Sequence, residues 1–481
     1  MKLKANAPKL EPTLGLFTVT LLVVSSIIGS GVFKKVAPMS EMLGSPTLVL
    51  ACWLLAGLVT LLGALTNAEV AGLIADSGGQ YVYFKKMYGK FFAFLYGWAS
   101  FAVIQCATTA SVAYVFAQSV HAMVPLPGLP EHIASIQVLG LFVPFDNFGV
   151  KLLTIGLIVL LSVVNYRGVK YGGLITNVFA STVVVAIFGI IFAGLASSSG
   201  AISNIQQTIP TDTIANLGLF GAMFAGMRSA FWAYEGWNNV GFIGGEIKDP
   251  KRNLPLALTT GVIFVVVTYL LINFVYLYIS PIGAIITEYQ TDGNSITAIG
   301  VAQTILGSWG GGAIAVLILI STFNCTNSTI LTAPRIYYAM AKDGLFFRKA
   351  AEVHPTFHTP GRAIAISAIW SSVLVLSGSF DQLTDMLVFA AFIFYGAGAF
   401  GVYILRRKMK DTARPYKVNL LLPALFTLFC VVLVVVTLIE APRESGIGLV
   451  LITAGVPFYY FWNKRAIAEG VTTDDDIAIE K

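Results

Sequence analysis

The chain has 481 residues, of which 56% are hydrophobic and 11% are charged. Since a soluble domain carries about 25% charged residues, this composition excludes an ordinary soluble enzyme or binding module. The formal net charge is +6, but no basic stripe is interleaved with stacking aromatics, so a nucleic-acid-binding surface is excluded as well.

Apolar segments long enough to cross a bilayer, which takes roughly 20 residues each, follow one another along nearly the whole chain. They predict an all-α polytopic membrane protein with about twelve transmembrane helices. The segments are residues 14–37, 46–73, 91–122, 149–167, 172–197, 216–244, 255–280, 311–341, 362–379, 384–405, 419–440 and 447–463. The hydrophilic residues 1–13 before them show no cleavable signal peptide, and residues 464–481 after them form a tail.

The distribution of basic residues predicts the orientation in the membrane. If the N-terminus is cytoplasmic and the segments alternate, all of the 30 Lys and Arg residues lie at the cytoplasmic face except Lys34, Lys35, Lys151, Arg228 and Arg443. Such an excess of positive charge on one side is typical of the cytoplasmic side. We therefore expect a plasma membrane protein, or an inner membrane protein in a bacterium, with both termini in the cytoplasm.

The first apolar segment is interrupted by the sequence Gly29-Ser30-Gly31. A break in mid-membrane leaves backbone groups without water to bind, so it persists where it lines a cavity. The N–H groups of Ser30 and Gly31 would bind a carboxylate at the new helix N-terminus, and the carbonyls of Ile27 and Ile28 would bind an ammonium group. This set fits the zwitterionic head of an α-amino acid; the alternative is a glycine pair that only permits close helix packing.

A second break lies in the sixth segment, at residues 233–239. Trp232, Ala233 and Glu235 would offer carbonyls where the helix unwinds, and Gly236 supplies backbone freedom. Trp232 is a candidate lid over the bound head group, the alternative being a packing aromatic. Paired breaks in two halves of a chain are the best sequence indication of a transporter's binding site.

Two acidic residues in the apolar segments call for a role. Glu235 lies at mid-membrane, where an acid indicates function by default; it could bind a cationic side chain, carry a proton or cap nearby N–H groups. Glu69 lies near the cytoplasmic end of the second segment. We expect it to pair with a basic residue there, in a structural or inner-gate role.

The eighth segment carries a run of small polar residues from Ser321 to Thr329. Their hydroxyls can bond their own backbone or a neighbouring helix. Thr322 and Thr326, one turn apart, could instead coordinate Na⁺ together with carbonyls of the first break, because hard cations bind oxygen ligands. Both interpretations stay open.

Segments 1–5 and 6–10 each begin with an interrupted helix, as in an inverted repeat. We therefore divide the transporter core, residues 14–405, into repeats at 14–197 and 216–405. Segments 11 and 12, with the loop before them, occupy residues 406–463 outside the repeat, and residues 464–481 are the cytoplasmic tail.

Three connecting stretches carry predictions of their own. The outer stretch 281–310 is expected to hold short helices. The inner linker 245–255 indicates a turn followed by a helix that opens at Pro255. The acidic residues 469–481 indicate disorder.

No motif indicates an enzyme, a metal centre or a cofactor. The four cysteines fall inside apolar segments, without the spacing of a metal or redox site. They are Cys52, Cys106, Cys325 and Cys430. No histidine lies in mid-helix, so a nucleophile–base pair is absent, and no nucleotide site is visible.

Four motifs together form a recognisable set: residues 27–33, 77–83, 233–238 and 252–255. In this order and spacing they resemble the L-type amino acid transporter family, part of the amino acid–polyamine–organocation superfamily with the LeuT-like fold. The resemblance implies a substrate site between segments 1, 3, 6, 8 and 10, with Trp232 as the gating aromatic. It adds four residues near the side-chain pocket, which are Gln105, Ser111, Thr329 and Phe392.

Two departures from the family pattern matter. Members that pair with a heavy ancillary glycoprotein use a cysteine in the outer loop between helices 3 and 4, and loop 122–148 has none. The resemblance therefore implies a transporter without a disulfide-linked ancillary subunit. Many relatives also place a lysine in helix 5 where this chain has Val183; the ammonium usually stands where Na⁺ sits in sodium-coupled relatives.

The expected function is secondary active transport of L-amino acids by alternating access, as an exchanger or as a symporter coupled to Na⁺ or H⁺. The alternatives are a transporter of cationic amino acids or polyamines, and an amino-acid sensor on a transporter scaffold. A channel would need a continuous polar path, and a membrane enzyme would need catalytic groups within the helices.

Overall fold

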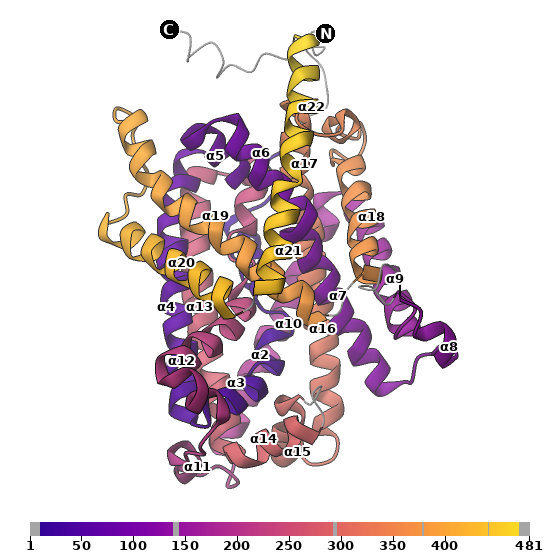
Figure 1. Ribbon diagram of the computed structural model, residues 1–481, viewed down its shortest axis with the longest axis vertical. Helices are drawn as coiled ribbons and strands as arrows, with labels where there is room; N and C mark the ends of the chain where they lie inside the picture. The colour runs from indigo at the N-terminus through magenta and orange to yellow at the C-terminus, as the bar shows by residue number, and fades with distance from the viewer. Residues whose placement is uncertain (1–9, 138–143, 292–295, 378–379, 441, 471–481) are drawn as a thin grey trace.

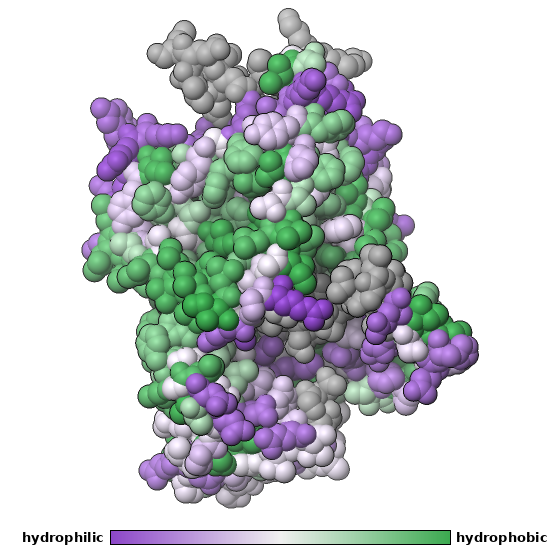
Figure 2. Space-filling model, in the orientation of Figure 1, coloured by the Kyte–Doolittle hydropathy of each residue, from purple (hydrophilic) through white to green (hydrophobic). Residues whose placement is uncertain are grey.

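The computed structural model describes residues 10–137, 144–291, 296–377, 380–440 and 442–470, and the side chains of residues 380–386 lie outside this description. The described chain is a bundle of helices elongated along one axis (Figure 1). The labelled elements α5, α17 and α22 lie at one end of the bundle, and α11, α14 and α15 lie at the other. Figure 2 shows hydrophobic residues gathered over the body of the bundle, with hydrophilic residues concentrated toward its two ends, as a bilayer requires.

The first half of the chain forms five spans. The first is divided into three pieces and the third into α-helix, π-helix and α-helix. The elements are α1 (Leu16–Ile27), α2 (Gly31–Lys34), α3 (Val36–Leu43), α4 (Pro46–Leu73), α5 (Gln80–Tyr88), α6 (Lys90–Ala99), the π-helix η1 (Ser100–Ile104), α7 (Gln105–Met123), α8 (Glu131–Ala134), α9 (Phe148–Tyr166) and α10 (Val169–Ala196).

The second half of the chain begins with the sixth span. Its elements are α11 (Ile202–Gln206), α12 (Asp212–Tyr234), the 3₁₀ turns η2 (Asn239–Phe242) and η3 (Gly244–Glu246), α13 (Pro250–Ile279), α14 (Ile282–Thr291), α15 (Thr297–Leu306), α16 (Gly310–Thr332), α17 (Pro334–Lys342), η4 (Arg348–Ala351), α18 (Gly361–Ser377) and α19 (Phe380–Lys408). The last two spans are α20 (Leu421–Glu440) and the pair α21 (Pro442–Thr453) and α22 (Gly455–Ala468).

Within the described residues, 10 helices or helical runs are long and apolar enough to cross a membrane. The predicted sixth and ninth segments correspond to α12 and α18. Helix α18 has 17 residues, and α12 bends at Gly218, whose φ of 69° interrupts the helix. The all-α polytopic fold class is confirmed. The short helices expected in the outer stretch are α14 and α15, whereas most of the predicted acidic tail lies outside the described residues.

Two predicted boundaries are wrong. The helix after the inner linker begins at Pro250, not at Pro255, because a proline with its fixed φ suits the first helical turn; Pro255 lies inside α13. The sixth segment does not continue as helix to residue 244. Beyond Tyr234 the chain forms only the turns η2 and η3, in a stretch rich in glycine.

Glu69 lies at the end of α4 and makes the pairing predicted for it. Its carboxylate accepts a hydrogen bond of 2.9 Å from Arg406 Nε and forms an ion pair of 3.1 Å with Arg414 Nε. It also accepts the N–H of Val418 at 2.8 Å. One buried carboxylate therefore connects the second span to the end of α19 and to the loop before α20.

Candidate functional site

Both breaks are present and they touch each other. Helix α1 ends at Ile27, and helical structure resumes at Gly31. On the sixth span Glu235 is extended and Gly236 has φ +99°. A Cβ on Gly236 would collide with the carbonyl oxygen of Ser26. Gly236 is therefore required twice over, for its backbone conformation and for the close approach of the two breaks.

Tyr269 of α13 connects the two breaks. Its hydroxyl lies 3.0 Å from the Ile27 carbonyl oxygen and 3.1 Å from the Ala233 carbonyl oxygen. Both carbonyls are exposed because the helices stop there, and a membrane interior offers no water to satisfy them. A single side chain thus stabilises both interruptions. Sequence reasoning missed it, because one tyrosine in an apolar helix resembles a packing residue.

The two breaks enclose a cavity of about 20 Å³, little more than the space of one water molecule, so the site is nearly closed in this conformation. It is lined from the first break by Ser26, Ile27, Gly29, Ser30 and Gly31; from the second by Trp232, Ala233 and Glu235; and from the neighbouring helices by Thr108, Val112 and Cys325. Seven of the predicted site residues therefore meet in one place. The sequence did not single out Ser26, Thr108, Val112 or Cys325 for this cavity.

Ser30 occupies the N-cap position of α2 and is fully buried. Its hydroxyl has no hydrogen-bond partner among the described residues. Buried polar groups are nearly always satisfied, so an orphan hydroxyl in a cavity indicates a ligand. Being at the start of a helical turn, it favours an anionic group.

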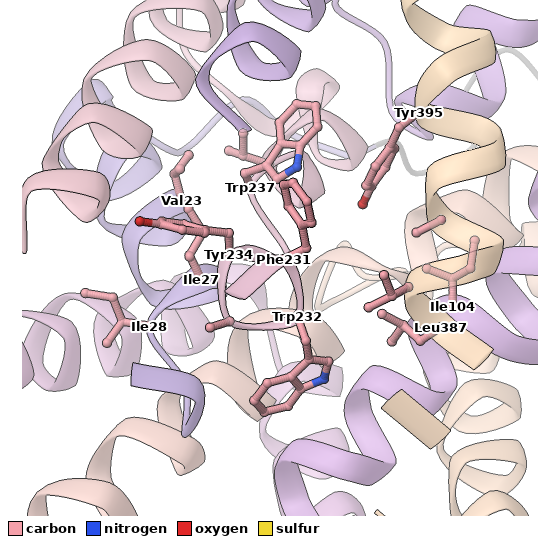
Figure 3. Close-up of a cluster of buried hydrophobic side chains, with 14 of the residues drawn as sticks. Val23, Ile27, Ile28, Ile104, Phe231, Trp232, Tyr234, Trp237, Leu387 and Tyr395 are labelled. Atoms are coloured by element: carbon pink, nitrogen blue, oxygen red, sulfur yellow. The ribbon is translucent and has the colours of Figure 1, made fainter. Parts of the chain in front are cut away.

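Trp232 covers the cavity. Its ring lies beside Gly31, where an added Cβ would be 3.1 Å from the nearest ring atom. The Lys35 ammonium lies 5.1 Å from the centroid of this ring. Figure 3 shows Trp232 pointing away from the cluster that contains Phe231 and Trp237. This position is compatible with the lid predicted from the sequence.

Glu235 receives a short hydrogen bond from a residue the sequence did not indicate. The Tyr395 hydroxyl of α19 lies 2.5 Å from Glu235 Oε1, and Figure 3 shows that hydroxyl directed toward the second break. No basic side chain in the described part of the chain forms an ion pair with Glu235. A buried carboxylate beside a cavity, supported by a neutral donor, leaves room for a cationic ligand group.

The four residues carried over from the family resemblance, and Gly236, lie outside the cavity lining. Gln105 bonds Asn239 at 3.1 Å, joining α7 to the turn after the second break. Ser111 and Thr329 donate to backbone carbonyls of their own helices, as hydroxyls in helices commonly do. Phe392 packs one layer behind the cavity, 4.9 Å between ring centroids from Phe231.

The hydroxyls proposed for an ion site have other partners. Thr322 donates to the Ile318 carbonyl at 2.7 Å, and Thr326 donates to the Thr322 carbonyl at 2.8 Å. Ser321, not these two, reaches the first break, 3.0 Å from the Ile28 carbonyl and 3.1 Å from that of Gly29. Ser321 of this run therefore supports the first break, and the sodium site at Thr322 and Thr326 stays a prediction.

A buried ion pair holds the turn that follows the second break, on the side of the bundle that carries α17. Arg335 of α17 and Glu246 of η3 form a bond of 2.7 Å with side-chain exposures of 0% and 1%. The Glu246 carbonyl also accepts the N–H groups of Thr13 and Leu14 at 2.9 and 3.0 Å. The N-terminal segment, the turn after the break and α17 are thereby tied together.

Comparison with known proteins places the chain among amino acid transporters. Residues 14–462 match the family model described as Amino acid permease. The serine/threonine exchanger SteT of Bacillus subtilis is 32% identical over 460 residues, covering 95% of this chain and 98% of the relative. The human b(0,+)-type amino acid transporter 1 is 29% identical over 96% of this chain and 90% of its own length. The human cystine/glutamate transporter is 28% identical over 95% and 88%.

Replacing Gly31 by alanine tests whether the cavity is the binding site. A Cβ at Gly31 would lie 2.5 Å from Ala233 Cβ and 2.7 Å from Ala233 Cα, so the two breaks would be forced apart. We expect the affinity for amino acids to fall more than about tenfold, or ~1.4 kcal/mol. The measurement is scintillation proximity binding on purified protein. Gly156→Ala on α9 is the matched control, since a Cβ there would meet nothing within 4 Å and Gly156 does not line the cavity; equal behaviour of the two variants would contradict the site.

Removing the Tyr269 hydroxyl tests the connection between the breaks. Tyr269→Phe removes the one O–H donor that the Ile27 and Ala233 carbonyls share, and an unsatisfied buried group costs about 1–3 kcal/mol. We expect a lower melting temperature in detergent and about tenfold slower amino acid uptake (~1.4 kcal/mol). Tyr276→Phe, two turns along the same helix, is the control, because the buried Tyr276 hydroxyl has no partner among the described residues. A Tyr269→Phe protein that behaves like this control would refute the role.

Proposed function

The chain belongs to the amino acid permease family, and from this premise we propose that it exchanges L-amino acids across the plasma membrane by alternating access. Transport of amino acids across a membrane follows from the family and from its relatives, whose names describe exchangers and transporters, not enzymes. The proposal concerns the mechanism, the substrate contacts and the membrane. The observation that carries it is the single cavity formed where two broken helices meet.

The cavity offers separate groups to the two ends of an amino acid. The Ser30 hydroxyl, together with the N–H groups at the start of α2, would bind the carboxylate. The carbonyls of Trp232 and Glu235 would bind the amino group. The Ile27 carbonyl accepts the Tyr269 hydroxyl and, at 2.9 Å, the Gly29 N–H, so it would join them when one of these bonds opens. The substrate side chain would then lie toward α7 and α16, beside Thr108 and Cys325.

Closure in this mechanism uses the connections already described. Substrate contacts would draw the two breaks together under Trp232, with Tyr269 joining them. Release to the opposite side would require the Glu246–Arg335 pair and the backbone bonds to Thr13 and Leu14 to separate. A hollow lined by residues that include Lys34, Tyr114 and Glu288 lies on the other side of the cavity and would serve as its entrance.

Exchange is preferred to sodium symport in this proposal because of what one relative's name describes. The name of SteT, the relative at 32% identity, describes an exchanger.

The remaining assignments concern the protein's surroundings. All four cysteines are buried, which supports a transporter that needs no disulfide-linked ancillary subunit. The excess of Lys and Arg at the end that carries α5, α17 and α22 supports a cytoplasmic location for that end, and hence for both termini.

Counterflow in proteoliposomes tests the proposed mechanism. Vesicles loaded with an unlabelled amino acid should accumulate the labelled one, and omission of Na⁺ or of a pH gradient should leave the initial rate unchanged. Accumulation only with Na⁺ or a proton gradient would establish symport instead. Binding without any counterflow would indicate a sensor.

Glu235→Gln tests whether the carboxylate recognises substrate charge. If it does, affinity for lysine and arginine should fall more than about tenfold (~1.4 kcal/mol), whereas affinity for serine or leucine should change less than about threefold (~0.7 kcal/mol). Competition against a labelled neutral amino acid measures both. Tyr395→Phe, which keeps the carboxylate but removes its 2.5 Å donor, should retain the discrimination. Equal loss for both substrate classes, with altered pH dependence, would indicate that Glu235 carries a proton.

A further inference from the structure

A hollow remote from the substrate cavity opens on the flank of the bundle, at the end where α17 and α22 lie. It has a volume of about 590 Å³ and lies between α18, α22, the start of η1 in the third span, and the loop after α17. Figure 1 shows α22 and α18 on either side of the chain that follows α17. Nothing in the transport mechanism uses this space.

The interior of the hollow is aromatic and aliphatic. Phe101 of η1 lies at its base, with ring centroids 5.3 Å from Phe346 and 5.7 Å from Trp370. Phe346 in turn lies 5.6 Å from Trp462 of α22. The lining also includes Ile369, which is exposed. An apolar hollow of this kind, open at the flank of a membrane-spanning bundle, suits a hydrocarbon chain.

The rim of the hollow is basic. Arg348 and Lys349 of η4 and Arg465 of α22 line it, against one acidic residue, Glu469. Glu469 is shared between two of them: Arg465 Nε donates to it at 3.0 Å, and Arg348 also pairs with it. Lys349 forms no ion pair in the part of the chain that the structure describes. Three cations with one carboxylate leave a positive rim above an apolar interior.

We propose that this hollow binds an anionic phospholipid, with an acyl chain between Phe101 and Trp462 and the headgroup phosphate at Lys349 and the two arginines. Basic pockets between transmembrane helices on the cytoplasmic side bind anionic headgroups, and this rim lies at the end of the bundle rich in Lys and Arg. A zwitterionic lipid would fill the apolar interior with its acyl chain but would bring no net negative charge to the basic rim. The charge of the rim therefore decides between the two lipid classes.

The bound lipid would contact the framework of the transport site. Trp370 Nε1 donates to the Ala102 carbonyl of η1 at 3.2 Å, and Tyr337 of α17 donates to the Ser100 carbonyl at 3.2 Å. The same third span continues into α7, which supplies Thr108 and Val112 to the cavity. Occupancy of the hollow thus fixes the position of a helix that the substrate touches.

Brominated lipids provide the test, because bromine quenches tryptophan at short range and Trp370 and Trp462 line the hollow. The full-length protein is reconstituted in phosphatidylcholine with increasing fractions of brominated phosphatidylglycerol. We expect half-maximal quenching at a lower mole fraction than with brominated phosphatidylcholine. The Trp370→Phe/Trp462→Phe double variant should lose this selective quenching, which locates the lipid.

Charge variants complete the test. Lys349→Gln should raise the fraction needed for half-maximal quenching about fivefold, as expected for one basic residue at an anionic headgroup. Lys464→Gln is the matched control, since Lys464 is exposed on α22 next to Arg465 but does not line the hollow; it should leave the fraction unchanged. Equal quenching by the two lipids, or an equal shift in the two lysine variants, would overturn the proposal.

Discussion

Peptide groups opened in the middle of a membrane must find partners within the protein or in a ligand, and this requirement organises the molecule. The carbonyls freed at the first break are taken by Tyr269 and by Ser321, two hydroxyls from different helices. The Ala233 carbonyl at the second break is taken by the same tyrosine. Two hydroxyls that line the cavity, those of Ser26 and Ser30, have no partner among the described residues. In the proposed binding mode, the Ser30 hydroxyl is the donor left open for the substrate carboxylate.

The rest of the bundle keeps these few groups in register. Helix α13 carries Tyr269 and packs against α4. Helix α16 holds the first break through Ser321, and another of its side chains, Asn327, donates to the Gly172 carbonyl of α10 at 3.1 Å. Two buried acids, Glu69 and Glu246, form ion pairs with Arg406 and Arg335 toward the end of the bundle that carries α5 and α17. Removing one member of a buried pair leaves an uncompensated charge. Each of these ion pairs is therefore expected to stay formed or to break completely, with both partners changing together.

Much of this could be read from the sequence, and the failures have identifiable causes. Glycine and polar residues inside apolar segments located both breaks, and the position of Glu69 predicted a basic partner, which is Arg406. Tyr269 and Tyr395 could not be found, because their partners lie 242 and 160 residues away and a tyrosine in an apolar helix has no periodic signal. The family pattern placed Gln105 and Phe392 near the pocket, yet their neighbours Asn239 and Phe231 hold them behind the lining. Helix rotation, which decides such cases, is set by packing.

The π-helix η1 sets that rotation for the third span. An α-helix has 3.6 residues per turn, so each residue advances the side chains by about 100°, and the widened turn at Ser100–Ile104 offsets everything after it. Within this turn Phe101 faces the aromatic hollow, and beyond it Thr108 and Val112 face the cavity. One continuous helical span thus contributes side chains both to the aromatic hollow and to the cavity between the breaks. The length of that turn is consequently a constraint separate from the identity of its residues: deleting one residue would rotate the side chains of α7 by about 100° relative to those of α6.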